Sequence, residues 1–226
     1  MTIFYYASYG LVIIGALISI IASWNVRRTY KKYSSYGNSR GIRAEQVAQT
    51  ILNSAGIYDV RIERISGSLT DHYSPREKVL RLSDSVYGSL SVAAIGVAAH
   101  ECGHAIQHAR GYFPLTLRSM VIPVVNIGST LSWPVILLGL IFGWTGLIDI
   151  GIILFSLVVF FQFITLPVEF NASGRALSIL RERNILYGQE LEGSRKVLIA
   201  AALTYVAALV SSILQLLRLI LLRRRR

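Results

Sequence analysis

Residues 147–168 read LIDIGIILFSLVVFFQFITLPV, and Asp149 is the only charged side chain among them. A helix needs roughly 20 mostly apolar residues to cross the hydrocarbon layer of a bilayer. Three further stretches, residues 3–24, 119–142 and 197–217, contain no charged side chain. The whole chain is 53% hydrophobic and only 15% charged, which is unusually apolar for a soluble domain. We therefore expect a mainly α-helical multi-pass membrane protein with about four transmembrane helices.

The chain carries a formal net charge of +11, but its basic residues lie beside the apolar stretches. Several occur between Arg27 and Arg43, directly after the first stretch, and the chain ends in the run Arg223–Arg226. This pattern fits membrane orientation and anionic headgroups better than nucleic acid. We expect a protein of the cell membrane that has the lipid bilayer, and no nucleic acid, as a partner.

Basic residues concentrate on the cytoplasmic side of membrane proteins, which orients the spans. The last span is ambiguous, because a full crossing would put its terminal arginines outside, against this rule. That helix either crosses or lies partly along the interface. The chain then divides into a first transmembrane helix (1–24), a cytoplasmic module (25–118), a transmembrane hairpin with its tip outside (119–168), a cytoplasmic helix (169–196), and a last transmembrane helix with a basic tail (197–226).

The cytoplasmic module has the pattern of a small α+β unit. Apolar residues recur at helical spacing in RAEQVAQTILNSAGI, residues 43–57. Alternating residues predict short strands in DVRIERI (59–65) and KVLRLS (78–83), on either side of the polar loop SGSLTDHYSP (66–75). The second strand could offer an edge to an extended substrate, although an ordinary paired strand is the default expectation. Ser89 or Ser91 can begin a helix that runs to about Arg110.

That last helix carries the sequence HECGH, which places His100, Glu101 and His104 close together. Because a helix turns about 100° per residue, the two histidines project on one face with the glutamate beside them. Imidazoles at i and i+4 can bind one zinc ion, and the glutamate can act as general base toward a water. We predict one Zn²⁺ ion here. Cys102 points away from this face and is expected to be a packing residue.

A third zinc ligand must come from another segment. His108 lies about 12 Å from His100 along the helix axis, too far for both to bind one ion. The position at which the metzincin pattern requires a further histidine is Arg110. His72 is the one other histidine of the chain.

An acidic third ligand must lie on the same side of the membrane as His100. This condition excludes Asp149, near the outer tip of the hairpin. Glu169 follows Pro167, where a new helical register can begin, and the hairpin returns it to the side of His100. A carboxylate at that place could also simply favour a helix N-terminus.

Four blocks, GSLTDHYSPREKVLRLS, AAHECGHAIQHA, EFNASGRAL and AALTYVAA, resemble the signature blocks of the YugP-type family of membrane zinc metallopeptidases. The similarity covers most of the chain. It implies a gluzincin-like arrangement, in which HExxH and a distant glutamate hold the ion. By this resemblance His100, His104 and Glu169 are the zinc ligands and Glu101 is the catalytic base.

Related membrane gluzincins carry an aspartate four residues after the ligand glutamate, where it orients a histidine ligand. Here that position is Ser173, which can form a hydrogen bond but carries no charge. Asn171 is an alternative orienting residue. A peptidase also needs a donor for the developing oxyanion, and His72, Tyr73 and Arg175 are candidates.

The favoured function is that of a membrane-bound, zinc-dependent metalloendopeptidase acting on a polypeptide, either a membrane protein or an unfolded one. The alternative is a membrane scaffold or adaptor that retains a structural or vestigial zinc site. Glu101 counts against the alternative, because a purely structural site needs no base. A transporter is disfavoured, because the spans hold almost no ionisable residues.

Overall fold

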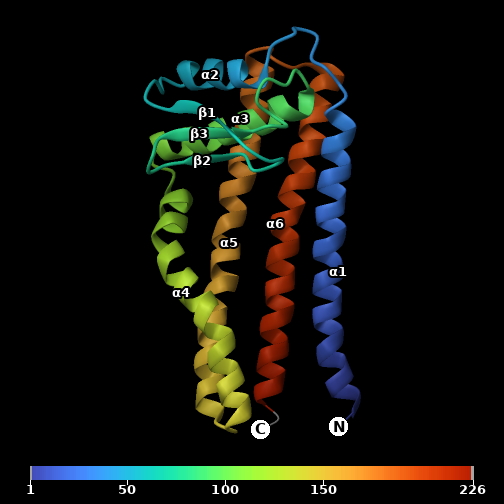
Figure 1. Cartoon of the computed structure of the whole chain (residues 1–226), viewed down its shortest axis with the longest axis vertical. Coiled ribbons are helices and arrows are strands. Elements are labelled where there is room, and N and C mark those ends of the chain that lie inside the picture. Colours follow the sequence, from blue (N-terminus) through green and yellow to red (C-terminus); the bar gives the residue numbers. More distant parts are fainter. Residues whose placement is uncertain (1, 225–226) are drawn as a thin grey trace. The chain divides into compact units, whose positions relative to one another are not determined.

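The computed structural model describes residues 2–224, which form six helices and three strands (Figure 1). The helices of this part are α1 (Thr2–Tyr33), α2 (Ala44–Ser54), α3 (Val92–Ala109), α4 (Phe113–Ile141), α5 (Thr145–Glu182) and α6 (Gly188–Arg223). The strands are β1 (Arg61–Ile65), β2 (His72–Ser74) and β3 (Val79–Ser83). By length and composition, α1, α4, α5 and α6 could each cross a membrane. The predicted fold class is therefore confirmed.

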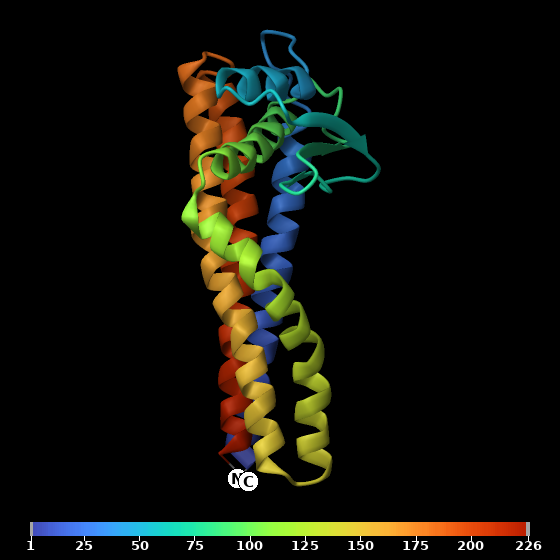
Figure 2. The ribbon, with the colours of Figure 1, turned by 90° about the vertical axis from the view of Figure 1, so that its left-hand side faces the viewer.

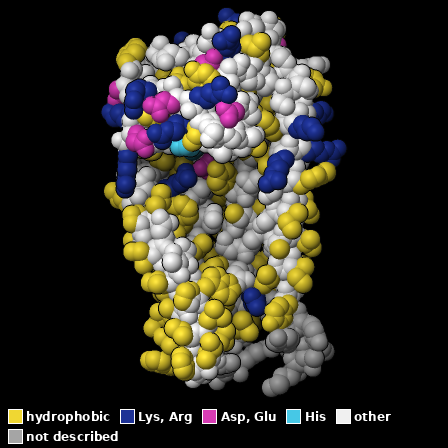
Figure 3. All heavy atoms as spheres, viewed as in Figure 1, with side chains coloured by type: hydrophobic (Ala, Val, Ile, Leu, Met, Phe, Trp, Pro, Cys, Tyr) yellow, Lys and Arg dark blue, Asp and Glu magenta, His cyan; other side chains and the backbone are white. Residues whose placement is uncertain are grey.

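The chain divides into two compact units. The first comprises Met1–Ser23, Thr116–Leu166 and Leu203–Arg226, and the second comprises Trp24–Leu115 and Pro167–Ala202. On the face drawn in Figure 3, hydrophobic side chains predominate on the first unit, whereas charged side chains gather on the second. The first unit thus has the surface expected in contact with lipid, and the second has the surface expected in contact with water.

Helices α4 and α5 are joined by a short turn and pack closely through small residues. A Cβ added at Gly151 would lie only 3.1 Å from the carbonyl oxygen of Ser132, the kind of close approach that small residues allow between membrane helices. Pro123 and Pro134 lie inside α4, and Figure 2 shows that this helix bends. The bend is expected, because proline removes helical hydrogen bonds.

The end of α6 is paired with the start of α5. Arg223 donates hydrogen bonds from Nε (2.8 Å) and from a terminal nitrogen (3.0 Å) to the two carboxylate oxygens of Asp149. Both residues belong to the first unit. The sequence left open whether the last helix crosses or lies along the interface. The length and composition of α6 would allow it to cross a membrane, and within the first unit its end lies beside the start of α5.

Helix α5 runs without interruption through Pro167. The sequence suggested that a new helical register begins after this proline, and the structure instead carries Glu169 inside the same helix. Membrane helices tolerate an internal proline, because neighbouring groups satisfy the backbone that it leaves unpaired. The boundary between the two units nevertheless falls between Leu166 and Pro167.

The second unit contains a three-stranded sheet in the order β1-β3-β2, with β1 parallel and β2 antiparallel to β3. Both predicted strands are present. KVLRLS is an ordinary paired strand, as expected by default, and it offers no open edge, because β3 is the central strand. Part of the predicted polar loop forms the edge strand β2, which is too short to show an alternating pattern.

Helices α2 and α3 form the core of this unit together with the sheet. The apolar face predicted for residues 43–57 is buried in α2. Ser91 caps α3, where its hydroxyl accepts a hydrogen bond from the Ala94 amide at 3.2 Å. Helix α3 packs against α2, β2 and β3, and this packing holds HECGH in place.

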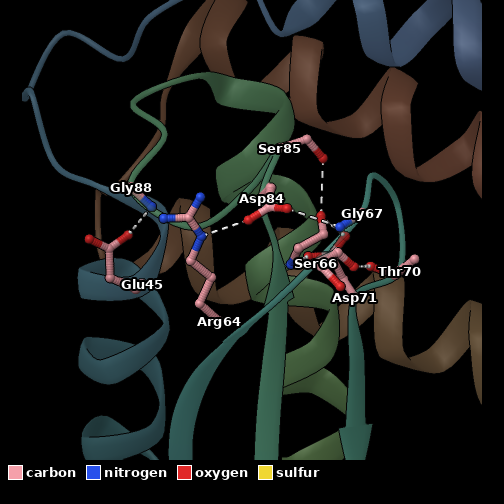
Figure 4. Close-up of polar contacts among 10 residues, drawn as sticks. Glu45, Arg64, Ser66, Gly67, Thr70, Asp71, Asp84, Ser85 and Gly88 are labelled. Carbon is pink, nitrogen blue, oxygen red and sulfur yellow. Dashed lines mark hydrogen bonds and ion pairs between the residues drawn. The ribbon is translucent and has the colours of Figure 1, made fainter.

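The loop between β1 and β2 is fixed by two aspartates (Figure 4). Asp84 accepts hydrogen bonds from Arg64 Nε (2.7 Å) and from the Gly67 amide (3.0 Å). Asp71 accepts from the amide (2.7 Å) and the hydroxyl (2.9 Å) of Ser83. The loop therefore enters β2 in a defined conformation.

Candidate metal site

His100 and His104 lie on one face of α3, as their spacing predicts. Their ring centroids are 4.7 Å apart and the rings are nearly perpendicular, at 86°. The Nε2 atoms of both rings face Glu169 of α5, whose Oε2 atom lies 3.2 Å from His100 Nε2 and 3.6 Å from His104 Nε2. Residues far apart in the sequence thus meet at one point within the second unit.

These three side chains have the chemistry and the spacing of a zinc site. Each offers one ligand atom, and the three atoms lie within 4.8 Å of one another. Two imidazoles and a carboxylate are a usual zinc donor set, and bonds of about 2.1 Å in a tetrahedron separate the ligand atoms by about 3.4 Å. The separations of Glu169 Oε2 from the two histidine nitrogens, 3.2 and 3.6 Å, are close to that value, so the residues present fit the ion.

Gly103 allows the two helices of the site to approach each other. A Cβ at this position would lie 2.6 Å from the carbonyl oxygen of Ala172 and 3.1 Å from its Cα. The backbone of α3 therefore rests on the backbone of α5, one residue before His104. The glycine of HECGH is explained by this contact, which the sequence alone did not indicate.

Each candidate histidine ligand has a partner on its other ring nitrogen. His100 Nδ1 lies 3.0 Å from the hydroxyl of Ser173, and His104 Nδ1 lies 3.0 Å from Oε1 of Gln107. Such outer partners set the orientation of metal-binding imidazoles. Ser173 was among the expected orienting residues, whereas Gln107 was missed. At about 100° per residue, Gln107 falls on the same helix face as both histidines, and this was the signal available in the sequence.

Asn171, the other expected orienting residue, contacts neither histidine in the described hydrogen bonds. Its Oδ1 accepts from Gln107 Nε2 at 3.0 Å and from Arg175 Nε at 2.7 Å. Arg175, one of the candidate oxyanion donors, also lies 6.0 Å from the centre of the Tyr112 ring. Asn171 and Arg175 therefore do not belong to the group of candidate ligands, His100, His104 and Glu169.

The remaining candidates lie outside the three-residue group. His72 Nδ1 lies 2.9 Å from the Thr70 carbonyl, and the Tyr73 hydroxyl lies 2.9 Å from His108 Nδ1. His108 is not one of the three grouped residues, and that it does not bind the ion stays a prediction. Cys102 is fully buried, with its thiol 3.6 Å from the Ala48 carbonyl of α2, and burial raises the pKa of this thiol well above its usual range. The oxyanion role of His72 stays a prediction.

Glu101 is buried beside the candidate ligands. Its carboxylate accepts no hydrogen bond from any residue in the described part of the chain, so its oxygens are available to a water or a substrate. Burial tends to lower the pKa of His104, but the nearby Glu169 carboxylate and the charge of Glu101 outweigh it, so the pKa lies above its usual value. A proton therefore competes with a metal ion for His104 at mildly acidic pH.

Comparisons with known proteins agree with this geometry. A family described as "putative neutral zinc metallopeptidase" matches residues 8–224. The chain is 47% identical over 204 residues to a protein of Bacillus subtilis (strain 168) named "Putative membrane protease YugP", covering 90% of this chain and 91% of that protein. No solved structure matches the chain.

Proposed function

This chain belongs to the family of putative neutral zinc metallopeptidases, and on that premise we propose that it is a membrane-bound, zinc-dependent endopeptidase. One observation carries the proposal. Two histidines of α3 and a buried glutamate of α5 present their ligand atoms to one point, beside a carboxylate that has no hydrogen-bond partner in the described chain. A structural zinc site has no use for that second carboxylate.

In the proposed reaction His100, His104 and Glu169 hold the ion, and Glu101 handles protons. Bound zinc supplies a Lewis acid that polarises a peptide carbonyl and makes a neighbouring water more acidic. Glu101 accepts a proton as the water attacks the carbonyl carbon, and it then donates the proton to the nitrogen of the breaking C–N bond. The products are a carboxylic acid and an amine, and Glu101 returns to its starting state.

We also propose that the site works on the cytoplasmic side of the membrane. The basic residues between Arg27 and Arg43 and those from Arg175 to Lys196 all belong to the second unit, which carries the site. The positive-inside rule assigns such segments to the cytoplasm. Substrates would then be polypeptide segments exposed at that face.

The proposal is tested with the purified full-length protein and an unfolded casein substrate. We expect cleavage that stops when a zinc chelator is added and returns when zinc is restored. His108→Gln should bind zinc as the wild type does, because His108 lies outside the metal group. Stoichiometric zinc binding without cleavage of any unfolded substrate would favour the membrane scaffold instead.

A further inference from the structure

Gln107 is a fully buried amide on the face of α3 that carries the candidate zinc ligands. A buried amide is costly unless its hydrogen bonds are made. Here they are made: Nε2 lies 2.8 Å from the Val168 carbonyl and 3.0 Å from Asn171 Oδ1, and Oε1 lies 3.0 Å from His104 Nδ1. Gln107 thus connects His104 to α5 through three contacts.

The donor and acceptor of each hydrogen bond between Arg175 and His104 are fixed, because one group in this series of bonds can only donate and another can only accept. Arg175 can only donate, so the atom of Asn171 that faces its Nε must be the amide oxygen. The Val168 carbonyl can only accept, so the atom of Gln107 that faces it must be nitrogen. It follows that Gln107 presents its oxygen to His104, and that His104 Nδ1 must carry a proton to bond with it.

We propose that Gln107 is a positioning residue for His104 and that Asn171, anchored by Arg175, holds it in place. A neutral imidazole with its proton on Nδ1 has its lone pair on Nε2, the atom that faces Glu169. The hydrogen bonds that run from Arg175 through Asn171 to Gln107 therefore select the His104 tautomer that can bind a metal ion. They also fix the plane of the His104 ring. The inference rests on the proposed zinc site and deepens it.

The two histidines differ in this respect. The partner of His100 Nδ1 is the Ser173 hydroxyl, which can either donate or accept and so selects no tautomer by itself. His104 is held by an acceptor whose orientation is set by two further groups. The loss of Gln107 should therefore weaken zinc binding more than the loss of the Ser173 hydroxyl.

The test compares zinc dissociation constants of full-length variants, measured by competition with a chromophoric chelator at fixed pH. Gln107→Met keeps the size of the side chain but removes its hydrogen bonds, and we expect zinc to bind about 10–100-fold more weakly, the usual effect of losing such a partner. Ser173→Ala should have a smaller effect. Thermal unfolding of the metal-free proteins shows whether each variant is folded.

Asn171 offers a matched pair that remains informative if Gln107→Met does not fold. Asn171→Asp keeps an oxygen that accepts from both Gln107 and Arg175, so zinc affinity should stay at or above the wild-type value. Asn171→Leu removes that oxygen and should weaken zinc binding. Equal affinities in these two variants would overturn the proposed positioning role.

A second measurement reports the hydrogen bond at His104 Nδ1 directly. The chain has four histidines, so ¹⁵N-histidine NMR of the zinc-loaded protein is simple to assign. We expect an exchange-protected Nδ1 proton on His104 in the wild type and in Asn171→Asp, but not in Gln107→Met. An Nδ1 proton of His104 that exchanges equally fast in the wild type and in Gln107→Met would overturn the inference.

The outcome is separable from that of the peptidase assay. If zinc affinities follow the expected order while casein stays intact, the positioning role stands and the peptidase proposal fails. If the wild type cleaves casein while all variants bind zinc equally well, the peptidase proposal stands and the positioning role fails.

Discussion

Glu169 is a buried carboxylate between two histidines of another helix, and its position is best explained by a shared ion. Its Oε2 lies 3.2 Å from His100 Nε2 and 3.6 Å from His104 Nε2. With zinc, all three side chains satisfy their polar atoms at once. Burial of each of these polar side chains is therefore favourable only when the other two are present.

Replacement of Glu169 by Gln should abolish tight zinc binding. The amide keeps the size of the side chain but loses the negative charge that the ion requires, and the loss should exceed the roughly 10–100-fold effect of losing an outer partner. Zinc content of the purified protein, measured by atomic emission, checks this. His108→Gln is the control and should keep its zinc. Full zinc content in Glu169→Gln would remove this residue from the site.

At the scale of the elements, the site depends on how closely α3 approaches α5. The sequence predicted α3, its N-cap and the two strands β1 and β3, because each has a local pattern of its own. It could not reveal the contact of Gly103 with Ala172 or the bonds of Gln107 to α5, because both depend on which helix lies opposite. The three-residue strand β2 was missed because it is too short to carry a pattern.

Gly103→Ala should push the two helices apart. The added methyl group would meet the backbone of Ala172 at 2.6 Å, and overpacking of this kind costs about 1–3 kcal/mol. We expect lower thermal stability together with weaker zinc binding. Gly174→Ala is a matched control on α5, because a Cβ there meets nothing within 4 Å. It should stabilise the helix by about 0.5–1 kcal/mol, and equal losses in both variants would contradict the steric explanation.

The loop before β2 should respond to acid through Asp84. The pKa of this carboxyl lies below its usual range, chiefly because Arg64 donates to it and also because the Gly67 amide does. A depressed pKa stabilises the folded state above the unfolded-state value, and this contribution is lost as the pH falls through the folded-state value. Asp84→Asn should therefore lower the urea midpoint at pH 7 and make a smaller difference at pH 3. A difference that does not change with pH would contradict this account.

At the scale of the whole molecule, apolar segments suited to lipid alternate along the sequence with polar segments suited to water. The long apolar stretches indicate the candidate membrane spans, because a helix that crosses a bilayer must be both long and apolar. The side reached by the last helix was ambiguous in the sequence, since its terminal arginines oppose the positive-inside rule. In the structure one of those arginines, Arg223, is paired with Asp149 at the start of α5, so its charge is balanced within the first unit.

The orientation can be tested with single cysteines, since the one native cysteine, Cys102, is fully buried. We expect Phe142→Cys, in the exposed turn of the hairpin, to react with a membrane-impermeant maleimide in intact cells. Ser68→Cys, in the exposed loop of the second unit, should react only after the membrane is opened. The reverse pattern would place the site outside.

The central claim is that this protein hydrolyses peptide bonds with a zinc ion and Glu101 as base. The most direct measurement determines zinc content and casein cleavage on the same preparations of the wild type and of Glu101→Gln. We predict equal zinc content in the two proteins, and cleavage by the wild type that falls by at least about 100-fold in the variant, the scale of losing a general base. Undiminished cleavage by zinc-loaded Glu101→Gln would contradict the account.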